Sequence, residues 1–99
     1  MLIEYTKQYE KWYLRLKSKD TKFIVIDRIN RVKNGDFGDH KDLKRGLFEL
    51  RFKIAGGIRI YYTFKKTGEI ILLLVGGNKD SQENDIKKAR ILRNLYLGE

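Results

Sequence analysis

The sequence predicts an α+β fold in which two N-terminal helices pack on a small, largely antiparallel sheet of three to four strands, followed by a C-terminal helix. Apolar residues recur every three or four positions in the first third of the chain and again from residue 80 onward, which indicates helices. Between residues 47 and 65 they recur every second position, which indicates strands. The 99 residues, 41% of them hydrophobic, suffice for one core, so residues 1–99 are predicted to be a single domain.

Two helices are expected near the N-terminus. Thr6 can cap the first, whose apolar face consists of Tyr9, Trp12, Tyr13 and Leu16. The second is predicted to begin after Asp20 and to end at Asn34-Gly35. Its expected apolar face holds Phe23, Ile26 and Ile29, with Val25 and Val32 alongside. Residues 1–5 before the first helix are a candidate extra strand, and residues 36–46 after the second have no period and are predicted to form a basic surface loop.

The central hairpin has one apolar and one charged face. Phe48, Leu50, Phe52 and Ile54 alternate with Glu49, Arg51 and Lys53, and Ile58, Ile60, Tyr62 and Phe64 alternate with Arg59, Tyr61, Thr63 and Lys65. A three-residue loop pairs apolar with apolar positions and places Lys53 opposite Arg59, Arg51 opposite Tyr61 and Glu49 opposite Thr63. Opposed cations destabilise a sheet, so this face suggests an anionic ligand, unless Glu49 and solvent neutralise it.

A third long strand and a helix complete the predicted chain. Thr67-Gly68 is expected to turn into residues 70–75, which are apolar at every position and therefore covered on both faces. The second cover is the C-terminal helix, which starts at a capping box formed by Asp80 and Glu83 and ends before Gly98. Its predicted apolar face consists of Ile86, Ala89, Leu92, Leu95 and Tyr96.

The composition restricts the function. Twenty-two Lys and Arg against thirteen Asp and Glu give a net charge of +9, which suits RNA, DNA, an anionic membrane or an acidic protein as partner. The absence of cysteine and the single His40 leave almost nothing to bind zinc or to build a His-dependent triad, and no cofactor is expected. No apolar stretch is long enough to cross a membrane and the start lacks a signal peptide, so a cytoplasmic protein is expected.

Four segments, in order, resemble a known family. They are Phe48-Glu49-Leu50-Arg51, Gly57-Ile58-Arg59-Ile60-Tyr61-Tyr62, Leu73-Leu74-Val75-Gly76-Gly77-Asn78-Lys79, and Gln82 with Asp85, Ile86 and Ala89. Together they resemble the HigB-like branch of the RelE/ParE superfamily of type II toxin–antitoxin toxins, over nearly the whole chain. The resemblance implies a RelE-like fold and a metal-independent endoribonuclease that cleaves mRNA on the ribosome and so inhibits translation. It also implies a cognate antitoxin as partner, HigA-like with a helix-turn-helix.

The resemblance singles out Arg59, which follows the loop glycine as in family members, as the phosphate-binding arginine. Arg51 is expected to share this role, or else to form only a surface ion pair with Glu49. Lys79 would stabilise the charge of the transition state, or be an ordinary surface lysine at a helix start. Glu49 would act as base or as a structural ion-pair partner. Tyr61 shares the face of Arg59 and would stack on a base or donate a proton, whereas Tyr62 belongs to the core.

Further basic residues are expected to contact phosphates of the message and of ribosomal RNA; they are Lys53, Lys41, Lys44 and Arg45. The chain departs from the family pattern at Ile58, where many relatives have an aromatic residue, and at Asn78, where aspartate is common. It also has no matching tyrosine or histidine at the start of the last helix, which leaves the general acid open. Two alternatives remain: a ParE-like inhibitor of DNA gyrase, and an RNA-binding module that does not cleave.

Overall fold

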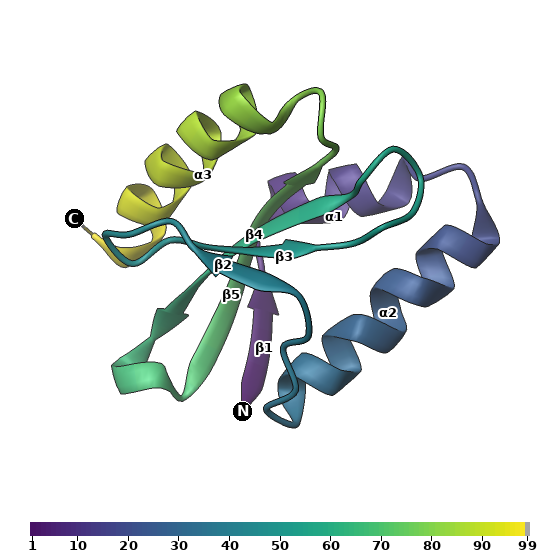
Figure 1. The fold of residues 1–99 in the computed structure, drawn as a ribbon. Helices are drawn as coiled ribbons and strands as arrows, with labels where there is room; N and C mark the ends of the chain where they lie inside the picture. The colour runs from purple at the N-terminus through teal and green to yellow at the C-terminus, as the bar shows by residue number, and fades with distance from the viewer. Residues whose placement is uncertain (99) are drawn as a thin grey trace.

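A computed structural model describes residues 1–98, and within them the chain forms three α-helices and a five-stranded mixed sheet (Figure 1). The strands are β1 (Leu2–Tyr5), β2 (His40–Asp42), β3 (Phe48–Arg51), β4 (Arg59–Lys65) and β5 (Ile70–Gly77), in the order β1-β5-β4-β3-β2. The helices are α1 (Lys7–Leu14), α2 (Lys19–Lys33) and α3 (Gln82–Leu97). The predicted α+β class and order of elements are confirmed, and β1 is the extra strand expected at residues 1–5.

The sheet separates two apolar clusters, as expected for β5, which is buried on both faces. Helices α1 and α2 cover one face and α3 covers the other (Figure 1). Strand β1 pairs with β5 in parallel and all other pairs are antiparallel. A short helical turn at Lys66–Gly68 joins β4 to β5 where Thr67-Gly68 predicted a turn.

Strand β2 was not predicted. Residues 36–46 were expected to be a loop, but His40–Asp42 pairs with the edge of β3. All three residues of β2 are exposed, so no alternation of apolar and polar residues marks the strand in the sequence.

The predicted register of the central hairpin is wrong by two residues. Arg51 lies opposite Arg59 and Glu49 lies opposite Tyr61, and the connecting turn is wider than the three residues expected. Ala55, Gly56 and Gly57 in this turn all have positive φ, of 47°, 75° and 81°. A shift of two residues keeps every side chain on its own face, so the apolar pattern satisfied both registers equally.

The predicted faces and caps of α2 and α3 need four corrections. In α2 the buried residues are Val25, Arg28 and Val32, while Phe23 is 70% exposed and Ile26 is 48% exposed. Ser18, not a residue after Asp20, caps this helix.

In α3, Ala89 and Leu92 are buried but Leu95 and Tyr96 are exposed, because the helix extends past the apolar cluster. The Asp80–Glu83 capping box is absent. Instead, Asn78 Oδ1 accepts from the backbone N–H groups of Asp80 and Ser81, at 2.9 and 3.1 Å.

Among residues 1–98, none of the helices combines the length and the apolar character that crossing a membrane requires.

Candidate functional site

The two arginines predicted to bind phosphate lie directly opposite each other, at the paired ends of β3 and β4. Two like charges at this position destabilise the sheet by a few tenths to about 1 kcal/mol. Glu49, two residues before Arg51 on the same face, is the carboxylate that offsets them. Its Oε1 is 3.6 Å from Arg51 Nε and its Oε2 is 4.0 Å from Arg59 Nε. The structure therefore brings three of the predicted site residues into one charge cluster.

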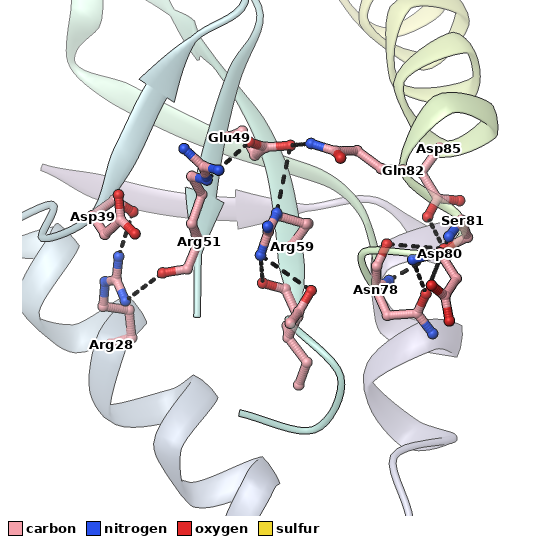
Figure 2. Close-up of polar contacts among 12 residues, drawn as sticks. Arg28, Asp39, Glu49, Arg51, Arg59, Asn78, Asp80, Ser81, Gln82 and Asp85 are labelled. Carbon is pink, nitrogen blue, oxygen red and sulfur yellow. Dashed lines mark hydrogen bonds and ion pairs between the residues drawn. The ribbon is translucent and has the colours of Figure 1, made fainter. Parts of the chain in front are cut away.

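Glu49 is fully buried, and Figure 2 shows it between the two arginines and α3. Gln82, the first residue of α3, donates from Nε2 to Glu49 Oε2 at 2.8 Å. This contact fixes the carboxylate from the helix side. The predicted open charged face is thus wrong for Glu49, since α3 covers this part of the sheet.

Tyr61 is also fully buried, in the apolar cluster beneath α3. A base could stack on its ring only if α3 moved away. Burial raises the pKa of Tyr61 above its usual value of 10, and the neighbouring carboxylate of Glu49 raises it further. Its hydroxyl makes no well-formed hydrogen bond. Tyr62, on the opposite face, belongs to the core as predicted.

Tyr61→Phe is expected to change the free energy of unfolding at pH 7 by less than about 1 kcal/mol, because the lost hydroxyl is poorly bonded. Its effect should appear in alkali. A tyrosine whose pKa is raised by folding contributes stability that is complete below pH 10 and is lost as the pH rises further. By pH 11 the wild type should therefore have lost about 1 kcal/mol more than the variant. Urea unfolding at pH 8 and pH 11 measures this, and equal losses in both proteins would contradict it.

A depression of about 340 Å³ lies beside the charge cluster. It is lined by Arg51, Lys53, Arg59 and Lys79, together with Asp39, Phe52 and the glycines of the hairpin turn. Two more predicted residues, Lys53 and Lys79, thus join the arginines. Lys79 comes from the β5–α3 connection, and its backbone N–H reaches Gly56 O at 3.4 Å.

Gly57 permits this close approach. A Cβ on Gly57 would lie 3.3 Å from Lys79 Cβ and 3.4 Å from Arg59 Nη1, at a φ of +81° that side chains rarely adopt. The Arg59 guanidinium also donates from Nη1 to the carbonyl oxygens of Gly57 and Ile58, at 3.2 and 3.3 Å. The turn therefore orients Arg59 at the depression, although the residue is only 8% exposed.

No site role was predicted for Asp39, Gln82 or Arg28, although Gln82 belongs to a segment that resembles the family. Asp39 is exposed and is the carboxylate that lines the depression. Arg28 of α2 is buried, and its guanidinium donates to the backbone oxygen of Phe37. It also donates to the backbone oxygens of Asp39 and Arg51 (Figure 2). It thereby holds the ends of β3 and of the segment before β2. A lone arginine in the helix and an aspartate in a loop carry no signal in the sequence that identifies these roles.

The other predicted RNA contacts lie elsewhere. Lys41 is on β2 opposite Glu49, and Lys44 and Arg45 are in the β2–β3 turn near the second half of α3. None of the three lines the depression. Among the described residues 1–98, no three histidine, aspartate or glutamate side chains gather as metal ligands would.

The amino-acid sequence matches a known protein family. Residues 13–96 fit the model of the family described as phage derived protein Gp49-like (DUF891). The chain belongs to the Gp49-like family. A protein of Haemophilus influenzae, described as an uncharacterized protein, is 38% identical over 90 residues, which cover 91% of this chain and 90% of that protein.

Solved structures show that this Gp49-like chain has the fold of the RelE toxin. A free mutant of E. coli RelE superposes with a TM-score of 0.67 at 10% identity, covering 93% of this chain and 95% of that one. RelE in the intact E. coli RelBE toxin–antitoxin complex gives 0.62 at 9% identity, covering 78% and 94%. The RelE-like fold predicted from the sequence is confirmed, with one more strand than expected.

Proposed function

We propose that this chain is the toxin of a type II toxin–antitoxin system, a metal-independent endoribonuclease of the HigB-like branch that cleaves mRNA on the ribosome in the cytoplasm. The observation that carries the proposal is the depression lined by Arg51, Lys53, Arg59 and Lys79. These four cations come from two strands, a turn and a connection, and they meet beside a buried carboxylate. Such a cluster suits a phosphate that gains negative charge during reaction.

The reaction needs no group beyond the RNA and the protein. The ribose 2′-oxygen attacks the adjacent phosphorus, the bond from phosphorus to the 5′-oxygen breaks, and a cyclic phosphate and a 5′-hydroxyl result. One proton leaves the 2′-hydroxyl and one must reach the 5′-oxygen. Arg59 and Arg51 bind the non-bridging oxygens, and Lys79 stabilises the charge that develops on the phosphorane.

The roles of the two carboxylates follow from their exposure. Glu49 is fully buried and faces Arg51, Arg59 and Gln82, so we assign it to orienting the arginines rather than to accepting a proton. Asp39 is exposed at the same depression, and we assign it as the acceptor of the 2′-hydroxyl proton.

The partner we propose is a HigA-like antitoxin with a helix-turn-helix. RelE, whose fold this chain shares, forms the RelBE toxin–antitoxin complex. A net charge of +9 favours a partner segment that is acidic.

Induction of the chain in bacteria, with mapping of 5′-hydroxyl ends on translated messages, tests the proposal. We expect growth to stop and new ends to appear inside codons, and co-expression of the antitoxin to prevent both. Growth arrest with intact messages would contradict the ribonuclease, and DNA gyrase supercoiling would then be the next assay. Purified chain that binds RNA and leaves it intact would instead indicate a binding module.

A further inference from the structure

A second cluster of cations lies away from the depression, at the second half of α3. Arg45, Arg90, Arg93 and Asn94 line a hollow of about 440 Å³. Among the described residues 1–98, no carboxylate and no apolar side chain lines it. Arg45 and Arg90 also form no ion pair with any carboxylate of those residues. Arg45 and Arg90 therefore bring positive charge to the hollow that an anion can neutralise.

The arginines of α3 are held by the β2–β3 turn. Arg90 donates to Leu43 O at 2.9 Å and to Lys44 O at 3.2 Å. Arg93 Nε lies 3.2 Å from both Gly46 O and Thr63 Oγ1. Since a guanidinium carries five N–H donors, Arg90 uses two of them here and remains able to bind an anion.

The backbone of the β2–β3 turn is strained where it packs against α3. Lys44, Arg45 and Gly46 have φ values of 73°, 53° and 77°, in the left-handed region that side chains disfavour. A Cβ on Gly46 would lie 2.5 Å from the Arg93 guanidinium, so glycine lets this side chain approach the turn, and the positive φ of Gly46 also favours glycine. Strain at a polar cluster is a reason to look for a ligand.

The hollow lies on the same side of α3 as the contact with Glu49. Gln82, Ile86 and Arg90 are spaced by four residues and share one face of the helix. Eight residues separate Gln82 from Arg90, a rise of roughly 12 Å. Lys41 of β2 is on the sheet face that α3 covers, because the neighbouring His40 packs on Phe37 at the opposite face. The hollow and the contact of Gln82 with Glu49 therefore lie on one side of α3, about two helical turns apart.

We propose that Arg45, Arg90 and Arg93 form a second phosphate-binding site, which takes the backbone of RNA at a place separate from the cleavage site. The identity of the bound RNA rests on the proposed function, whereas the binding of phosphate at this site does not. The entirely polar lining favours phosphates over a protein segment, since protein interfaces have an apolar core. Guanidinium groups bind phosphate oxygens in pairs.

Arg45→Gln tests the site, because the side chain is exposed and its removal should not disturb the fold. Arg15→Gln, an exposed arginine at the end of α1, is the matched control. Fluorescence anisotropy with a 20-nucleotide single strand and with an RNA duplex should show a Kd raised about two- to fivefold for Arg45→Gln. The slope of log K against log salt should become shallower by about 0.7 on the single strand. Arg15→Gln should leave both the Kd and the salt slope at their wild-type values.

The two RNA probes identify the source of the phosphates. A loss on the single strand indicates the strand being cleaved, and a loss on the duplex alone indicates a structured RNA such as that of the ribosome. Equal Kd and equal salt slope for Arg45→Gln, Arg15→Gln and wild type would overturn the proposal. So would unchanged RNA binding with weaker binding of a polyglutamate peptide. Wild-type chain that binds both RNAs and leaves messages on ribosomes intact would refute the ribonuclease and not this site.

Discussion

Arg59→Lys is expected to lower the rate of RNA cleavage by about 100-fold or more. Lysine keeps a positive charge near Glu49 but lacks the planar pair of donors that fits two phosphate oxygens. It also lacks the N–H groups by which Arg59 Nη1 is fixed to Gly57 O and Ile58 O. Single-turnover cleavage of a short RNA by purified protein measures the effect on the chemical step.

Two controls separate this effect from a loss of structure. Arg15→Lys makes the same change at an exposed position on α1 and should cleave at the wild-type rate. The unfolding midpoint of Arg59→Lys in urea should stay close to that of wild type, because Glu49 keeps a cationic partner. Cleavage within threefold of wild type by a folded Arg59→Lys would refute the role of Arg59 in binding the phosphate.

The sequence predicted which residues share a face better than it predicted their partners. Period-two alternation placed Glu49, Arg51, Arg59 and Tyr61 on one face, and the structure agrees. It could not fix the register, since a shift by two residues preserves the alternation. The wider turn put Arg51 rather than Lys53 opposite Arg59. Lys53 nevertheless lines the depression, because it follows Arg51 into the turn.

The burial of Glu49 and Tyr61 beneath α3 could not be predicted from the sequence. The sequence required a helix to cover the second face of β5, and α3 does so. Where α3 would stop covering the neighbouring strands depends on its packing angle, which no pattern in its sequence specifies. Glu49 and Tyr61 are therefore buried rather than open, and Gln82 gained a role that its position at a helix start did not indicate.

Because of the way α3 packs, the predicted RNA contacts lie at two separate places on the molecule. Lys53 and Lys79 lie at the depression, whereas Lys44 and Arg45 lie near the second half of α3. In the sequence all four are basic residues in loops. The hydrogen bonds from Arg90 and Arg93 to the β2–β3 turn show that this loop packs on α3, away from the cleavage site.

Glu49→Gln is expected to lower the free energy of unfolding by about 3 kcal/mol. The amide has nearly the same shape as the carboxylate, so the change removes charge and not volume. It leaves Arg59, whose side chain is only 9% exposed, without the carboxylate that faces its Nε. Removing one partner of a buried ion pair costs more than the pair contributes, because the remaining charge stays desolvated. Urea unfolding at pH 7 measures the loss, and a change below about 1 kcal/mol would contradict it.

The double variant Glu49→Leu/Arg59→Met tests why the protein contains the ion pair of Glu49 and Arg59. Apolar side chains of similar size can replace a buried ion pair at little or no cost, so this variant should regain most of the stability lost in Glu49→Gln. Cleavage of RNA should stay as low as in Arg59→Lys or fall further. Stability without activity would mean that the protein keeps Glu49 to orient Arg59 and Arg51 for a phosphate. If the double variant were instead less stable than Glu49→Gln, the pair would be required for folding itself.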